Sequence, residues 1–87
     1  MSDLKKKFDE AAAAVKKLKE DPGNDAKLQL YALYKQGAEG DVAGKRPGFT
    51  DLIGRAKYDA WARKKGLSGD KAMQAYVDLV EKLKQAS

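Results

Sequence analysis

Two tyrosines and a lysine share one side of a segment that reads as a helix. Tyr31, Tyr34 and Lys35 stand at positions i, i+3 and i+4, so a helical backbone places them on one face. An aromatic ring can stack or hydrogen-bond, and an ammonium group can neutralise a phosphate. The pattern favours a ligand that carries both a flat base and phosphates. The alternative is that both tyrosines are core residues with their hydroxyls at the rim, and this segment alone leaves both interpretations open.

A second lysine stands inside an apolar row of another predicted helix. Ile53, Lys57 and Trp61 follow one another at intervals of four, which aligns them along one side of that helix. A lysine in such a row either lays its methylene stem along apolar surface or faces an anion. Both interpretations stay open for Lys57, whereas Arg55 points elsewhere and is interpreted as a surface charge.

Two further side chains complete the candidate set, although solvation or packing is the default explanation for each. Lys16 lies beside Ala12 at the edge of an apolar stripe, within the charged run VKKLKE. Tyr76 lies in the middle of another apolar stripe, where core packing is the ordinary role. The candidate ligand-binding residues are Lys16, Tyr31, Tyr34, Lys35, Lys57 and Tyr76.

The residue types on which most enzymes rely are missing from the sequence. It contains neither histidine nor cysteine, which removes the commonest general base, the Ser-His-Asp triad and every imidazole or thiolate metal site. The segment EGDVAGKRPG has one carboxylate in register for a calcium loop, which is too few. We therefore expect no catalysis, no metal and no cofactor.

The length and the net charge of the chain limit the classes of protein to which it can belong. The 87 residues suffice for one domain, spanning 1–87, with a thin core. The 18 basic and 13 acidic residues give a net charge of +5, which suits an anionic partner without naming one. The N-terminal residues lack an apolar signal region, and the longest apolar run is AAAAV. We expect neither a secretory signal nor a membrane span, and a cytoplasmic location.

Four helices follow from the 3.6-residue periodicity and the breakers between apolar segments. Their expected spans are about 3–19, 25–38, 51–65 and 69–84. The expected N-caps are Asn24, Thr50 and Ser68, with Gly66 after the third helix. A loop of about a dozen residues separates the second and third helices, and the second helix is apolar over a wide arc that predicts two contacts, one of them outside the bundle. These elements indicate a small antiparallel four-helix bundle.

The stretches LYALYKQ, GDVAGKRPG, GRAKYDAW and AMQAYVDLVEKL occur in this order along the chain. Together they resemble the acyl-CoA-binding protein family, also called diazepam-binding inhibitor, from Phe8 to about Leu83. The resemblance implies an all-α, four-helix bundle with up-down-down-up topology. It also implies binding of long-chain acyl-CoA thioesters without catalysis.

The resemblance implies a role for each candidate residue. In the family, the first motif tyrosine and the lysine after the second contact the nucleotide phosphates, and these match Tyr31 and Lys35. The second tyrosine, matched by Tyr34, lies near the adenine. The lysine of the KxDAW segment, matched by Lys57, also binds the head group. The two remaining matches are Lys16 and Tyr76.

Four positions depart from the family pattern. Ile53 stands where a lysine is frequent, and Tyr58 stands where a tryptophan is usual. Lys45 replaces a glutamate in the loop, and Lys27 stands where an apolar residue is common. These changes bear on affinity and chain-length preference rather than on the class of ligand.

The expected function is that of a monomeric carrier and pool former for medium- to long-chain acyl-CoA in lipid metabolism. We expect high affinity, and at most transient contacts with membranes or acyl-CoA-using enzymes. A nucleic-acid-binding module is the first alternative, but the basic residues are scattered over all helices rather than clustered on one, so we expect no nucleic-acid partner. A protein-interaction or signalling role is neither supported nor opposed by the exposed charges.

Overall fold

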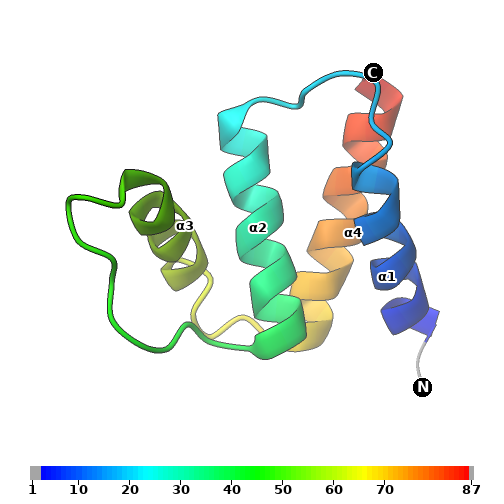
Figure 1. Cartoon of the computed structure of the whole chain (residues 1–87). Coiled ribbons are helices and arrows are strands. Elements are labelled where there is room, and N and C mark those ends of the chain that lie inside the picture. The colour runs from blue at the N-terminus through cyan, green and yellow to red at the C-terminus, as the bar shows by residue number, and fades with distance from the viewer. Residues whose placement is uncertain (1–2, 87) are drawn as a thin grey trace.

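The computed structural model describes residues 3–86, which form four helices. These are α1 (Asp3–Val15), α2 (Asn24–Glu39), α3 (Leu52–Ala62) and α4 (Gly69–Ala86). The helices α1 and α4 run in one direction and α2 and α3 in the other, so the predicted up-down-down-up, all-α fold is confirmed (Figure 1). The Cα atoms extend over 35 × 31 × 15 Å, so the bundle is flattened.

The helices lie in the order α3, α2, α4, α1 across the flattened bundle. The central helix α2 packs against both α3 and α4, while α1 packs against α4. Figure 1 shows α3 at the far side of α2 from α1. The hydrophobic core therefore lies among α1, α2 and α4, and the buried residues of its main cluster are Phe8, Ala11, Leu30, Leu33, Tyr76 and Val80.

The central position of α2 explains its wide apolar arc. One side carries Leu30 and Leu33 into the core, and another side supports α3. The two predicted contacts therefore exist, but the second is made with a helix of the same chain. The prediction of a contact outside the bundle is not needed to explain the arc. Tyr34 remains 40% exposed, and Tyr31 is partly buried.

A glycine allows α2 and α4 to approach closely. A Cβ atom at Gly37 would lie 3.0 Å from the Met73 Cγ and 3.3 Å from a Phe8 ring carbon. Such contacts are tighter than ordinary side-chain packing, so the absence of a side chain matters at this crossing. No helix within residues 3–86 combines the length and apolar character that crossing a bilayer would require.

Three predicted helix ends were wrong. The first helix ends at Val15 rather than near Lys19, because the backbone closes tighter i to i−3 bonds, such as the 2.9 Å bond from Lys17 N to Ala14 O. The second helix includes Asn24, and the capping position is Gly23, which offers no side-chain bond. The third helix ends at Ala62, after which residues 63–66 form turns.

The N-cap of α3 is Asp51 rather than Thr50. The Asp51 carboxylate accepts a hydrogen bond of 2.9 Å from the backbone N–H of Gly54. A Cβ at Gly54 would collide with that carboxylate, so the glycine fits the cap. The predicted Ser68 cap of α4 is confirmed, since its hydroxyl accepts a 3.2 Å bond from Lys71 N–H.

The long loop between α2 and α3, residues 40–51, is held against α3 by polar contacts. The Arg46 guanidinium makes two hydrogen bonds to the Asp59 carboxylate, of 2.7 and 2.6 Å. The Tyr58 hydroxyl donates to the Gly44 carbonyl at 3.0 Å. The loop's position therefore depends on a charged pair that spans 13 residues.

The start of the same loop is tied to the connection between α3 and α4. The fully buried Gln36 amide donates to the Asp41 carboxylate at 2.7 Å and to the Leu67 carbonyl at 2.9 Å. The Asp41 carboxylate also accepts the Gly66 N–H at 2.9 Å. These donors lower the pKa of Asp41 below its ordinary value, the Gly66 bond contributing most.

Acid is expected to release the 40–51 loop before it unfolds the core. Hydrogen bonds from Arg46 lower the pKa of Asp59 in the folded protein. The pair therefore stabilises the fold above the unfolded pKa of about 3.9, and this contribution is lost as the pH falls through the lowered native value. Hydrogen exchange between pH 5 and pH 2 should report earlier loss of protection around the loop than in α4.

Asp59→Asn serves as the control for this prediction, because it cannot titrate. Its loop should already be less protected at pH 5 and should change less on acidification. Because Asp41 titrates in the same direction, Asp41→Asn separates the two anchors. Simultaneous loss of protection in loop and α4 in the native sequence would contradict the prediction.

Candidate functional site

Three of the six candidate residues line one hollow, which we call the aromatic hollow. It holds about 500 Å³ and takes residues from α1, α2, α4 and the turn that follows α1. Its lining residues are Asp9, Ala12, Ala13, Val15, Lys16, Tyr34 and Tyr76. The spacing of Lys16 in the sequence gave no reason to favour ligand binding over simple solvation of its charge. In the structure, Lys16 lines a hollow together with two phenols.

Three rings pack together beneath this hollow. Phe8 stacks on Tyr34 with ring centroids 5.1 Å apart, and it meets Tyr76 edge to face at 5.2 Å. Tyr34 and Tyr76 are 5.8 Å apart. Burial raises the pKa of Tyr76, and neighbouring Tyr34 adds to the effect, so its phenol stays protonated at neutral pH. Tyr76 is therefore a core residue, as its position in an apolar stripe indicated, whereas part of the Tyr34 side chain is exposed to solvent.

The other three candidates form a lysine–tyrosine cluster between α2 and α3. The Lys35 and Lys57 ammonium nitrogens lie 5.9 and 5.3 Å from the centroid of the Tyr31 ring. Lys35 also lies 5.6 Å from the Trp61 ring. Aromatic faces attract cations at these distances, so the rings hold two positive charges close together. The Trp61 indole N–H in turn donates to the Gly40 carbonyl at 2.9 Å.

Lys35 is partly neutralised within the protein. Its ammonium makes a 2.7 Å ion pair with Glu39, one helical turn along α2. This hydrogen bond raises the pKa of Lys35, so the side chain remains charged at neutral pH. An anionic ligand would have to share Lys35 with Glu39, whereas within residues 3–86 no carboxylate lies within ion-pairing distance of Lys57.

A second hollow lies between α2 and α3, and we call it the apolar hollow. It holds about 390 Å³, and its lining residues are Asn24, Lys27, Leu28, Leu52, Ile53, Ala56 and Lys57. Two of them are large apolar side chains that face solvent, since Leu52 is 68% and Ile53 is 73% exposed. Lys57 belongs both to this hollow and to the lysine–tyrosine cluster, so its stem lies along apolar surface while its charge meets Tyr31.

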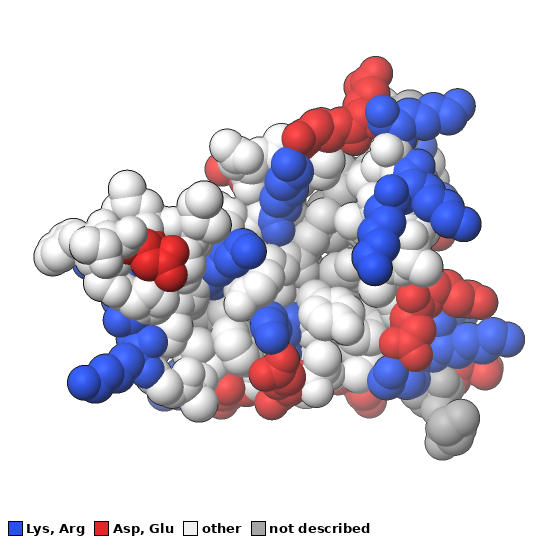
Figure 2. Space-filling view, in the orientation of Figure 1, with Lys and Arg blue, Asp and Glu red and all other residues white. Residues whose placement is uncertain are grey.

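One row of α2 connects the two hollows. Leu28, Tyr31 and Tyr34 follow at intervals of three, with Leu28 in the apolar hollow and Tyr34 in the aromatic hollow. The six candidates are therefore brought together as two groups of three, and this row contributes one tyrosine to each group. Figure 2 shows Lys and Arg side chains standing among uncharged atoms across one face, with acidic side chains mostly nearer its margins.

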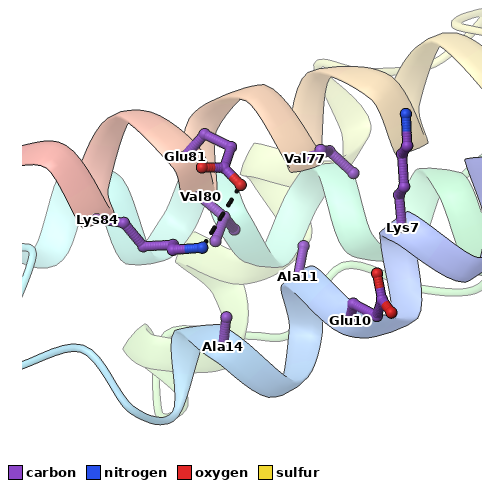
Figure 3. A pocket seen from close by; sticks show the side chains of 8 residues that line it. All are labelled: Lys7, Glu10, Ala11, Ala14, Val77, Val80, Glu81 and Lys84. Atoms are coloured by element: carbon purple, nitrogen blue, oxygen red, sulfur yellow. Dashed lines mark hydrogen bonds and ion pairs between the residues drawn. The ribbon is translucent and has the colours of Figure 1, made fainter.

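A third hollow, between α1 and α4, has a different character. It holds about 450 Å³ above a floor of small apolar side chains, and its charged residues are Lys7, Glu10, Glu81 and Lys84 (Figure 3). The Lys84 ammonium lies 3.5 Å from a Glu81 carboxylate oxygen. Carboxylates from both helices disfavour a polyanionic ligand here. No cluster of acidic side chains suited to a metal ion occurs within residues 3–86.

Sequence reasoning missed two parts of the candidate site. It treated Trp61 as a member of a row, yet the ring faces Lys35 from another helix. It also gave no role to Leu28 and Leu52, which line the apolar hollow with Ile53. The available signal was that Leu52 and Ile53 are adjacent in the chain, so a helix cannot bury both on one narrow stripe.

Comparison with known proteins shows which family the chain belongs to. The family model described as Acyl CoA binding protein matches residues 5–80. The chain is 58% identical over 76 residues to Acyl-CoA-binding protein homolog 1 of Caenorhabditis elegans, a match that covers 87% of this chain and 88% of that protein. The crystal structure of Oryza sativa Acyl-CoA-Binding Protein 2 superposes with a TM-score of 0.91 at 40% identity, covering 95% of this chain and 92% of that one.

A longer relative contains a similar segment. Enoyl-CoA delta isomerase 2 of Rattus norvegicus is 49% identical over 80 residues, which is 92% of this chain but 20% of that protein. The match therefore concerns one part of a larger protein. The family model, the similar full-length relative and the similar solved fold all agree, and the chain belongs to the acyl-CoA-binding protein family.

Proposed function

We propose that this protein binds medium- to long-chain acyl-CoA thioesters with high affinity and acts as a carrier and pool former in the cytoplasm. Residues 1–87 would form a single acyl-CoA-binding domain that works as a monomer. The main observation in support of this proposal is the α2 row, which joins a cationic, aromatic region to an apolar hollow. A ligand with a phosphorylated nucleotide at one end and a hydrocarbon chain at the other matches that sequence of environments.

The proposed head-group contacts use the six candidate residues. Lys16, Lys35 and Lys57 would meet the negative charges, and the phenols would donate hydrogen bonds or stack on the base. The apolar hollow would take the acyl chain along the exposed surfaces of Leu52 and Ile53. An uncovered apolar surface of this kind is what a ligand-binding groove presents before it is filled.

Magnitudes favour the acyl chain as the main source of affinity. Burying each CH₂ group contributes about 0.8 kcal/mol, so roughly fourteen carbons contribute on the order of 11 kcal/mol before ordering costs. A charge-assisted phosphate contact contributes about 1.5–3 kcal/mol. The lysines and tyrosines would therefore select the CoA head, and net affinity is expected between micromolar and nanomolar.

Titration calorimetry with acyl-CoAs of graded chain length tests the proposal. Affinity should rise with chain length, and free CoA and free fatty acid should each bind far more weakly than palmitoyl-CoA. Incubation of palmitoyl-CoA with pure protein should release no free CoA, because the sequence lacks the usual catalytic groups. Equal affinity for CoA and palmitoyl-CoA, or release of CoA, would contradict the proposal.

Tyr31→Phe and Lys35→Ala should each weaken binding without unfolding the bundle. The first removes a hydroxyl from a partly buried ring, and the second removes an ammonium from the cluster. Loss of a hydrogen bond to a charged group predicts about a tenfold weaker affinity in each case. Lys7→Ala, which removes a charge from the third hollow, is the matched control. A candidate whose variant bound like the control would have to be removed from the site.

A further inference from the structure

A carboxylate at the end of α2 engages the ammonium of one candidate lysine. The Glu39 carboxylate accepts a hydrogen bond of 2.7 Å from Lys35 Nζ, one helical turn away. Lys35 Nζ also lies 5.9 Å from the centroid of the Tyr31 ring and 5.6 Å from that of the Trp61 ring. Two aromatic rings and one carboxylate therefore surround this ammonium.

The position of Glu39 in α2 gives its charge no support from the helix. Glu39 is the last residue of α2, where the chain enters the 40–51 loop, and the final turn of α2 contains no basic residue (Figure 1). The C-terminal end of a helix carries negative partial charge, which disfavours a carboxylate. Within residues 3–86, Lys35 is the one cation within ion-pairing distance of Glu39. The interaction that favours the Glu39 charge is therefore the one with Lys35.

The ion pair contributes little to the stability of the fold. The side chains of Lys35 and Glu39 are 29% and 52% exposed, so water screens their attraction. The neighbouring Gln36, by contrast, is fully buried and bonds to two loops. A pair that adds so little to folding, yet engages a candidate head-group lysine, has its main consequence in ligand binding.

We propose that Glu39 is an internal competitor for the ligand phosphate at Lys35. An ammonium has three donors, but a carboxylate and a phosphate held side by side on it would repel one another. Binding therefore exchanges one ion pair for another and gains less than a phosphate meeting an unpaired lysine would gain. Glu39 acts through Lys35 and is a positioning residue that lowers affinity. This inference rests on the proposed function, because the phosphate is that of acyl-CoA.

The same competition would favour release of the ligand. The displaced Glu39 carboxylate remains on the same helix, one turn from Lys35, and pairs with the ammonium again when the phosphate moves away. Lys57, on the other side of the Tyr31 ring, has no such competitor, since no carboxylate within residues 3–86 lies within ion-pairing distance of it. The two lysines beside Tyr31 are therefore unequal, and Lys35 is the exchangeable one.

Titration calorimetry of Glu39→Gln with palmitoyl-CoA tests the competition. Glutamine keeps the size of the side chain but carries no charge, so Lys35 becomes available to a phosphate. Affinity should rise about three- to fivefold at low salt, which corresponds to the strength of an exposed ion pair. The gain should shrink as salt screens the charges. Unchanged or weaker binding would overturn the proposal, and weaker binding would show that Glu39 orients Lys35 for the ligand.

Two further variants serve as controls. Glu39→Asp keeps the carboxylate, and the Lys5–Asp9 pair of 2.9 Å shows that aspartate reaches a lysine at this spacing. Glu39→Asp should therefore bind palmitoyl-CoA like the native protein. Glu81→Gln removes the same charge from α4, where Glu81 lies 3.5 Å from Lys84, and it should change affinity little. An equal gain in Glu81→Gln would reveal an effect of net charge and would overturn the assignment to Glu39.

A double-mutant cycle shows whether Glu39 acts through Lys35. In a Lys35→Ala protein there is no ammonium to compete for, so Glu39→Gln should lose most of its gain. The same gain in both backgrounds would mean that Glu39 repels the ligand directly, which would overturn the competition. Urea unfolding midpoints of the native protein and Glu39→Gln should differ little, because the pair is exposed.

The rate of release gives an independent readout. Trp61 lies beside Lys35, so its fluorescence in a stopped-flow experiment can follow the displacement of palmitoyl-CoA. Glu39→Gln should slow dissociation more than it speeds association, because no carboxylate returns to the ammonium. A gain that came entirely from faster association would contradict the proposed competition during release.

The inference and the proposed function fail in different ways. The gain in Glu39→Gln should be similar for short and long acyl chains, because Glu39 does not line the apolar hollow. Native affinity that rises with chain length, without any gain in Glu39→Gln, would reject the inference alone. Failure of the native protein to bind palmitoyl-CoA would reject the proposed function, and the inference with it.

Discussion

Lys57→Met is expected to weaken acyl-CoA binding tenfold or more. The substitution keeps an apolar stem for the wall of the hollow but removes the ammonium that lies 5.3 Å from the Tyr31 ring. If that ammonium meets a phosphate, a charge-assisted contact of about 1.5–3 kcal/mol is lost. If Lys57 only covers apolar surface, methionine should substitute for it with little change in affinity.

Salt and chain length sharpen the test of Lys57. The loss should shrink as ionic strength rises, because the lysine's attraction is screened. It should be similar for short and long acyl chains, because the tail does not touch the ammonium. Lys7→Met is the control, and the single Trp61 provides a fluorescence readout close to Lys35. Native affinity of Lys57→Met at low salt would return this lysine to a purely structural role.

Phe8→Ala should be the most destabilising of the substitutions considered. The ring is 1% exposed and packs against both Tyr34 and Tyr76. Removing a buried aromatic ring from a core typically costs about 3–5 kcal/mol, because transfer energy is lost and a cavity remains. Two rings of the aromatic hollow would also lose their support, so ligand affinity should fall together with stability.

Urea unfolding followed by far-ultraviolet circular dichroism measures the destabilisation of Phe8→Ala. Phe49→Ala is the matched control, since it removes the same ring from a position that is 82% exposed. The control should change the free energy of unfolding by no more than about 0.5 kcal/mol. Similar unfolding midpoints for the two variants would mean that the core does not depend on Phe8.

The helices could be predicted from sequence because their apolar positions recur at the helical period. Phe8 and Ala11 on α1, and Tyr76 and Val80 on α4, are buried at spacings of three and four. Helix ends were less predictable because a cap depends on local geometry. Thr50 and Asp51 are both good capping residues by type, and only the backbone turn selects Asp51.

The candidate site, too, could be predicted from the sequence only in part. Tyr31, Tyr34 and Lys35 could be singled out because spacing within one helix fixes their common face. Lys16 and Tyr76 could be placed only by resemblance, because their proximity at the aromatic hollow depends on how α1 and α4 pack. The contact between Lys35 and Trp61 joins two helices and has no signature in either helix alone.

The attachment of α3 to the edge of the bundle has a consequence for motion. Its neighbour is α2, and the 40–51 loop is held to it by hydrogen bonds and an ion pair. We expect α3 and this loop to open as one cooperative unit, at lower free energy than the α1–α2–α4 core. An occupant lying across α2 and α3 would act as a latch, so amide exchange should slow most in α3 when acyl-CoA is added.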